Sequence, residues 1–258
     1  MMELPVLEWL IPADLDMLAI LVLIITSFLS ALVTATLGVG GGGFLLAVIA
    51  TFLPPVAIIP VHGLVQTGAN SNRAFMTRSH IDKPALRDFI IGACLGALLA
   101  SLLVVQLPVA VIQLTISLFV FYLTWGPKLK NQFLNGWRLK LAAAITTFIS
   151  MFVGASGPLV AAFIKQVSDQ RFVRVATFSA CMATQHGLKL LVFGWLGFAF
   201  SEWLGLILMM ILSGYAGTWV GLRLLSKISN RLFNYGFKIV LTILAFRLLV
   251  DAMLSLLQ

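Results

Sequence analysis

Charged residues are scarce in this sequence. Asp, Glu, Lys and Arg together fill 10% of its 258 positions, whereas hydrophobic residues fill 60%. A soluble globular domain normally carries about 25% charged residues. The composition therefore argues against an ordinary soluble domain and favours a chain that lies mainly in a lipid bilayer. Its length is sufficient for roughly eight membrane-spanning helices.

The few acidic residues avoid the hydrophobic segments. All nine (positions 3, 8, 14, 16, 82, 88, 169, 202 and 251) fall in expected loops or near expected helix ends. Proton pumps and many cation carriers depend on carboxylates inside the membrane. Because none lies in the middle of an expected span, a cationic substrate would find no counter-charge there.

Several chemical signatures are also missing. The two cysteines, Cys94 and Cys181, lie in apolar sequence without metal-ligand spacing, and three dispersed histidines make no metal set. No nucleophile or carboxylate pair points to an enzyme, and no phosphate-binding Gly-x-x-x-x-Gly-Lys-Ser/Thr motif is present. The net charge of +8 is scattered, which argues against nucleic-acid binding. We therefore expect no enzyme activity, no metal and no cofactor. The acidic amino terminus also argues against a cleaved signal peptide.

What the sequence does contain is a duplicated glycine motif. Gly38-Val39-Gly40-Gly41-Gly42-Gly43 has a shorter relative in Gly154-Ala155-Ser156-Gly157-Pro158, and adding 116 to Gly38 gives Gly154. The same offset relates Asn70 to His186 and Arg73 to Lys189. Glycine runs break helices, and corresponding breaks in two halves of a membrane protein indicate the binding site of a transporter.

Apolar runs predict the membrane-spanning helices. Six are expected, near residues 16–37, 84–106, 109–126, 138–154, 203–225 and 231–256. Two further regions, 43–74 and 157–193, are interrupted by Leu53-Pro54-Pro55 and by the charged stretch 165–174. Each of these two regions is expected to form a hairpin of two short or unequal helices.

Basic connectors orient these helices by the positive-inside bias. Residues 73–88, 128–140 and 223–231 are rich in Lys and Arg and are expected on the cytoplasmic side. The first half then enters from outside and the second from inside. We therefore predict an all-α polytopic membrane protein with an inverted repeat. Residues 1–126 form the first repeat and 127–258 the second, each with three spanning helices and a broken-helix hairpin, and both termini are extracytoplasmic.

Two pairs of glycines at helical spacing predict close helix packing. Gly92-x-x-x-Gly96 and Gly217-x-x-x-Gly221 are small-residue faces of the kind that let two helices approach each other. We interpret both as packing features without a direct role in binding.

Polar residues near the hairpins predict an anion site, because they are neutral donors or bases rather than acids. Lys189 either faces the substrate path or extends to a membrane interface, and Arg73 either assists it or anchors a basic loop. His62 is expected only to hydrogen-bond a neighbouring helix, whereas His186 is the one matched residue able to carry a proton. The candidate substrate-binding residues are Gly40, Gly41, Gly42, Gly43, Gln66, Thr67, Asn70, Asn72, Arg73, Ser156, Gly157, Thr184, Gln185, His186 and Lys189.

The duplicated glycine motif, together with the stretch from Ala176-Thr177 to Lys189, resembles the sulfite exporter TauE/SafE family of membrane permeases. The resemblance covers nearly the whole chain. It implies transport of a small sulfur-containing anion such as sulfite, a sulfonate or sulfoacetate, in agreement with the anion argument above. The second motif has only two glycines and carries Ala155 and Ser156, so the two hairpins need not contact a substrate alike.

The sequence thus predicts a secondary transporter of the inner membrane that works by alternating access. An anion channel, or a carrier of another small organic anion such as a carboxylate, is the alternative. Its expected partners are the lipid bilayer and a small anionic substrate, and the sequence is compatible with a homo-oligomer.

Overall fold

The computed structural model describes residues 12, 15–38, 40–103, 136–154, 156–165, 167–168 and 170–224, with isolated positions in 114–126 and 239–254. Within these residues the regular structure is helical and contains no strand. The helices expected at 109–126 and 231–256 lie largely outside the described residues.

The described part of the first half contains four α-helices in a row. The described part of the second half repeats this order of lengths, with a long helix, a short one, a very long one and a long one. The helices are α2 (Met17–Leu37), α3 (Gly41–Phe52), α4 (Pro55–Met76) and α5 (Lys83–Ser101), followed by α7 (Trp137–Val153), α8 (Gly157–Ile164), α9 (Arg171–Trp195) and α10 (Leu204–Leu224). Short 3-10 turns, η1 (Arg78–His80) and η2 (Phe200–Trp203), precede α5 and α10.

Local chemistry explains where the helices of the first half begin. The carboxylate of Asp16 accepts a hydrogen bond from the Ala19 amide at 2.7 Å, and that of Asp82 accepts one from Ala85 at 2.9 Å. Both acids are therefore N-caps, which satisfy amides that the first turn leaves unpaired. The start of α4 is set instead by Pro55, in the first helical position.

The two glycine motifs end helices in the same way. Gly38 closes α2 with φ of +83°, and Gly154 closes α7 with φ of +85°. A residue with a side chain rarely adopts this conformation, so glycine is required at both places. The breaks expected at the duplicated motif are therefore present, and α3 and α8 begin directly after them.

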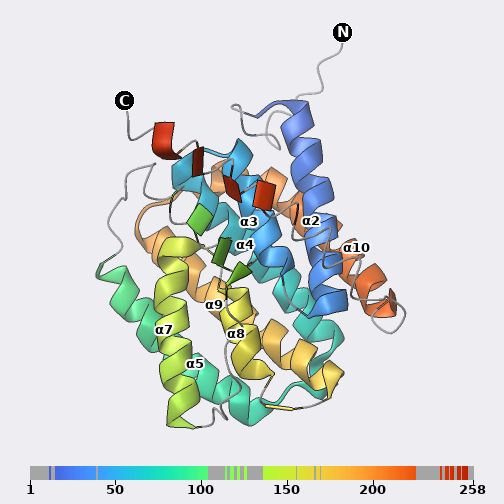
Figure 1. Ribbon diagram of the computed structural model, residues 1–258, viewed down its shortest axis with the longest axis vertical. Helices are drawn as coiled ribbons and strands as arrows, with labels where there is room; N and C mark the ends of the chain where they lie inside the picture. Colours follow the sequence, from blue (N-terminus) through green and yellow to red (C-terminus); the bar gives the residue numbers. More distant parts are fainter. Residues whose placement is uncertain are drawn as a thin grey trace.

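The helices form an inner group flanked by two outer pairs. On one side α2 packs against α10, and on the other α5 packs against α7, while α4 packs against α9 between them (Figure 1). Each outer pair joins a helix of the first half to a helix of the second. The two halves are therefore interlocked rather than side by side.

Glycine carries the close contact in each outer pair. A Cβ atom on Gly92 of α5 would stand 2.0 Å from the Lys140 carbonyl oxygen of α7, and one on Gly217 of α10 would stand 2.2 Å from the Phe28 carbonyl oxygen of α2. Gly96 and Gly221 lie one turn further along the same contacts. The packing role expected for both Gly-x-x-x-Gly pairs is confirmed.

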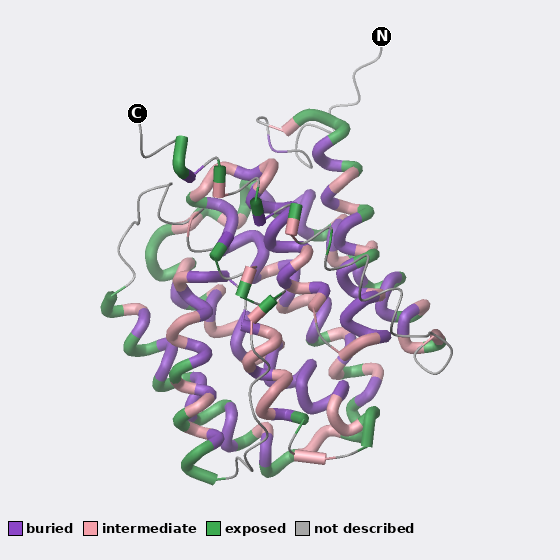
Figure 2. Tube along the Cα trace, viewed as in Figure 1, coloured by how far each residue is buried: buried purple, intermediate pink, exposed green. Residues whose placement is uncertain are grey.

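Apolar side chains cover the outer helices. Leu18, Leu21 and Ile25 of α2 and Leu95 and Leu98 of α5 are exposed, and exposed positions recur along the outer surface of the helices in Figure 2. Among the described residues, three segments are long and apolar enough to cross a membrane: Met17–Leu37, Lys83–Ser101 and Phe200–Leu224. Exposed apolar surface of this extent is typical of a protein that faces lipid.

Candidate functional site

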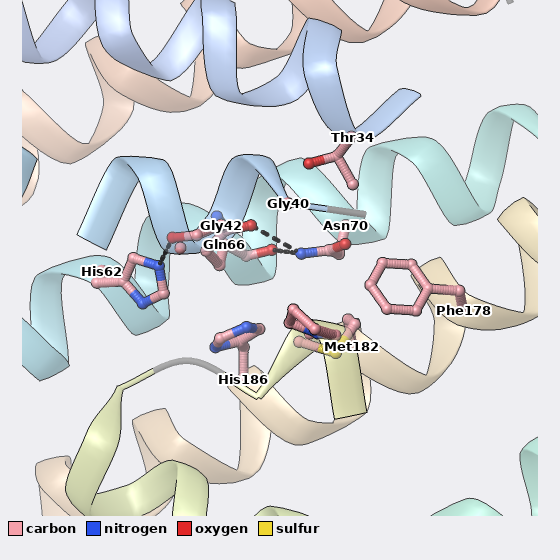
Figure 3. Close-up of a pocket in the computed structure, with 12 residues that line it drawn as sticks. Thr34, Gly40, Gly42, His62, Gln66, Asn70, Phe178, Met182 and His186 are labelled. Atoms are coloured by element: carbon pink, nitrogen blue, oxygen red, sulfur yellow. Dashed lines mark hydrogen bonds between the residues drawn. The ribbon is translucent and has the colours of Figure 1, made fainter. Parts of the chain in front are cut away.

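A small cavity lies between the start of α3 and the start of α8, where the two glycine motifs interrupt the helices. Its volume is about 20 Å³, room for one or two water molecules. Both glycine motifs border it, and α4 and α9 supply most of its side chains (Figure 3). Its lining consists of Thr34, Gly40, Gly42, Gly43, His62, Gln66, Asn70, Gly157, Pro158, Phe178, Met182 and His186.

The side chains from α4 and α9 occupy matched positions. His62, Gln66 and Asn70 are four residues apart on α4, and adding 116 to each gives Phe178, Met182 and His186 on α9. Residues at this spacing share one face of a helix. Each half therefore presents the same helical face to the cavity.

The two faces differ in chemistry. The α4 face carries an imidazole, a carboxamide and a second carboxamide. The α9 face carries Phe178 and Met182, with His186 as its polar group, and Pro158 adds to the apolar side. The cavity thus has one polar wall and one mostly apolar wall, and the Asn70 amide donates to the Gln66 side chain at 2.9 Å along the polar wall.

Two histidines meet at one end of the cavity. The ring centroids of His62 and His186 are 5.5 Å apart, with an angle of 75° between the planes, and Figure 3 shows both rings on the side away from Phe178. The Nε2 atom of His62 donates to the Gly42 carbonyl at 2.9 Å. His62 therefore bonds a neighbouring helix, as expected, and also lines the cavity.

A buried lysine stands beside this histidine pair. The Lys189 side chain is 0% exposed, and its Nζ donates to the Gly154 carbonyl oxygen at 2.6 Å. It passes Gly63, where a Cβ atom would stand 3.0 Å from Lys189 Cδ. The structure therefore places Lys189 inside the protein and not at an interface, next to the cavity lining rather than in it.

A buried arginine occupies the matched place at the other end. Arg73 is 1% exposed, and its Nη1 donates to Asn70 Oδ1 at 3.1 Å and to Ser179 Oγ at 3.5 Å. Within the described residues the salt bridges involve Asp88 with Arg87 and Lys140. Neither Arg73 nor Lys189 has a carboxylate partner in this part of the chain.

Two predicted site residues lie behind the cavity. The Ser156 hydroxyl donates to Gln185 Oε1, and Gln185 Nε2 donates to Thr147 Oγ1 at 2.9 Å. All three residues are buried and none lines the cavity. This chain of hydrogen bonds links the start of α8 to α9 and α7.

The remaining predicted residues also lie off the lining. Gly41 packs against α2, where a Cβ atom would stand 1.9 Å from the Ser30 carbonyl oxygen. Thr67 and Thr184 donate to carbonyls of their own helices, at 2.8 and 3.1 Å. The side-chain nitrogen of Asn72 is buried and has no partner in the described structure.

Sequence reasoning did not select five of the lining residues. Of these, Thr34, Pro158, Phe178 and Met182 look like ordinary membrane-helix residues, and His62 was expected to have only a structural role. The 116-residue offset was the available signal, because it relates His62 to Phe178 and Gln66 to Met182. Of the predicted residues, the cavity brings together Gly40, Gly42, Gly43, Gln66, Asn70, Gly157 and His186.

Comparison with known proteins identifies a family but no individual relative. No match was found among the curated proteins or among the solved structures. One family model, described as sulfite exporter TauE/SafE, matches residues 23–248, a range that contains every residue of the cavity. The chain therefore belongs to the TauE/SafE family of membrane transporters.

Proposed function

We propose that this protein is a secondary transporter that carries a small sulfur-containing anion, such as sulfite, a sulfonate or sulfoacetate, across the inner membrane by alternating access. The observation that carries the proposal is the cavity itself. It is bordered by both glycine breaks and lies between two buried cations, Lys189 and Arg73, which have no carboxylate partner in the described residues.

The polar wall supplies the contacts with the anion. Gln66 offers an amide donor, Asn70 holds its side chain in place through a hydrogen bond at 2.9 Å, and α3 and α8 both begin beside the same space, at Gly41 and Gly157. Unpaired amides at a helix start attract negative charge. Lys189 and Arg73 add positive potential from behind the lining, while Ser156, Gln185 and Thr147 hold α8 in place.

Alternating access requires two halves that can exchange roles. The α2–α10 and α5–α7 pairs support an inverted repeat, since each becomes the other when the halves are exchanged. The cations support it as well. Arg73 reaches Ser179 and Lys189 reaches Gly63, and adding 116 to Gly63 gives Ser179.

The direction of the chain in the membrane follows from its loops. Arg78, Lys83 and Arg87 surround the turn between α4 and α5, and this excess of positive charge supports a cytoplasmic position for that turn. Arg73 then lies at the cytoplasmic end of the cavity and Lys189 at the other end. Both termini are extracytoplasmic in this arrangement.

A carrier accounts for the cavity better than a channel does. With about 20 Å³, the cavity has room for one or two waters and must enlarge to admit an anion. A carboxylate would meet the same donors, so the choice between sulfur anions and carboxylates rests on the family and on direct measurement.

Counterflow in proteoliposomes tests this function. Vesicles are loaded in turn with sulfite, sulfoacetate, taurine or acetate. At least one sulfur compound inside is expected to exchange saturably with the same compound outside, because a carrier binds substrate on each side of the membrane in turn. Lys189→Gln should abolish this exchange by removing a buried positive charge. Lys165→Gln changes an exposed lysine between α8 and α9 and should retain it. Single-channel currents, or exchange of acetate alone, would reject the proposal.

A further inference from the structure

We infer that His62 and His186 form a proton-binding pair, which takes up a proton as the anion enters the cavity and releases it as the anion leaves. Anion movement would then be coupled to proton movement in the same direction. The inference rests on the proposed transport function, and it adds the coupling ion.

Each ring has one buried nitrogen, Nδ1, without a hydrogen-bond partner in the described residues. A carbonyl oxygen can only accept, so Nε2 of His62 carries the hydrogen that it donates to Gly42. Nδ1 of His62 is buried without a partner in the described residues, and so is Nδ1 of His186. Nδ1 of His62 can therefore bind a proton without breaking an existing hydrogen bond, and the unpartnered Nδ1 of His186 also has no hydrogen bond to lose.

Lys189 is the charged group that acts on both rings. Arg73, on α4, lies at the opposite end, beyond Asn70. Within their bounds α2, α3 and α8 contain no titratable side chain. The remaining titratable groups of α5, α7, α9 and α10 are not among the lining residues; they are Lys83, Arg87, Asp88, Cys94, Arg138, Lys140, Arg171, Arg174, Cys181, Tyr215 and Arg223.

This balance of charge makes protonation depend on the anion. In the empty cavity a positive ring would be repelled by Lys189, with no carboxylate in the lining to offset it. An anion in the cavity supplies the missing negative charge. By linkage, an anion that favours protonation is itself bound more tightly when the pair is protonated.

The proton site exists at one end only. Adding 116 to His62 gives Phe178, and subtracting 116 from His186 gives Asn70. The matched pair at the Arg73 end is thus a phenyl ring and an amide, and neither binds a proton at neutral pH. The coupling follows from a difference between the halves rather than from their similarity.

Magnetic resonance of isotope-labelled histidine tests the first step. The chain has three histidines, and the third, His80, is exposed in η1, so His62→Gln and His186→Gln assign all signals. Sulfite or sulfoacetate added at constant pH should shift one or both cavity signals toward the imidazolium form and leave His80 unchanged. Anion binding with no such shift would overturn the inference.

Vesicles that contain a pH-sensitive dye test the second step. Wild-type protein should move about one proton with each anion. The double variant His62→Gln/His186→Gln should move few protons or none, whereas His80→Gln should match the wild type. Anion exchange with the same proton ratio in the double variant would overturn the coupling alone. Failure of the wild-type protein to exchange any of the anions would reject the transport function as well.

Discussion

Single residues in and around this cavity have two kinds of task, and Gln185 shows the difference. The sequence predicts Gln185 as one of the substrate-binding residues. The structure uses both ends of its amide elsewhere, on Ser156 and Thr147. A carboxamide with both groups occupied holds helices together and has little left to offer a ligand.

Gln185→Ala is therefore expected to act on stability. It would leave two buried hydroxyls without partners, at a cost of about 1–3 kcal/mol, which corresponds to a fall of about 2–10 °C in the thermal unfolding midpoint. Thr184→Val is the control, since Thr184 bonds only within its own helix. If Gln185→Ala instead melted like wild type and lost anion binding, Gln185 would belong in the site.

Residue identity alone could not separate these tasks. Gln66 and Gln185 look alike in the sequence, yet one lines the cavity and the other lies behind it. The difference depends on which face of each helix is turned toward the cavity, and the identity of one polar residue does not show this. The sequence did predict that Gly40, Gly42, Asn70 and His186 belong to one site, because the two glycines lie in the duplicated motif and the 116-residue offset relates Asn70 to His186.

Helices of this protein are positioned by a small number of glycines. The breaks at Gly38 and Gly154 and the start of α8 at Gly157 agree with the prediction, whereas α3 begins at Gly41, two residues before the expected start at residue 43. Glycine and proline signals are local, so a sequence reports them well. The pairing of α2 with α10 and of α5 with α7 was not predicted, because the small-residue faces show that a helix has a close partner but not which one.

Substitution of the crossing glycines tests this packing. Gly92→Ala and Gly217→Ala should each cost about 1–3 kcal/mol, because the added methyl group would meet a carbonyl oxygen of the partner helix. Gly187→Ala, on α9, has open space within 4 Å and should be neutral or stabilising by about 0.4–1 kcal/mol. Thermal unfolding in detergent measures all three, and equal midpoints would contradict the close contact.

At the scale of the whole molecule, the proposed inverted repeat indicates how the two ends of the cavity would open. Ser179 lies at the Arg73 end of the α4–α9 contact and Gly63 at the Lys189 end. If the halves rock about the cavity, one end opens only as the other closes. A channel would open both ends together.

Single cysteines can follow the two ends. In a background that lacks Cys94 and Cys181, Ser179→Cys should react with an impermeant thiol reagent from the cytoplasmic side and Gly63→Cys from the opposite side. If addition of a transported anion increases the labelling rate at position 179, it should decrease the rate at position 63, and the reverse. Lys189 has a flexible side chain and can make room at position 63. Ser79→Cys, in the exposed η1 turn, should react equally throughout. Parallel changes at both ends would favour a channel.

The contact between Lys189 and Gly154 has a consequence for how an anion is recognised. A lysine paired with a carboxylate would hold a permanent partner that a single anion could hardly displace. Here the partner is a main-chain carbonyl at the negative end of α7, which carries only a fraction of a charge. An anion with a full negative charge attracts Lys189 more strongly than this carbonyl does. In the empty protein Lys189 therefore holds a partner that an anion can replace. When Lys189 leaves the Gly154 carbonyl for the anion, the end of α7 would become free to move.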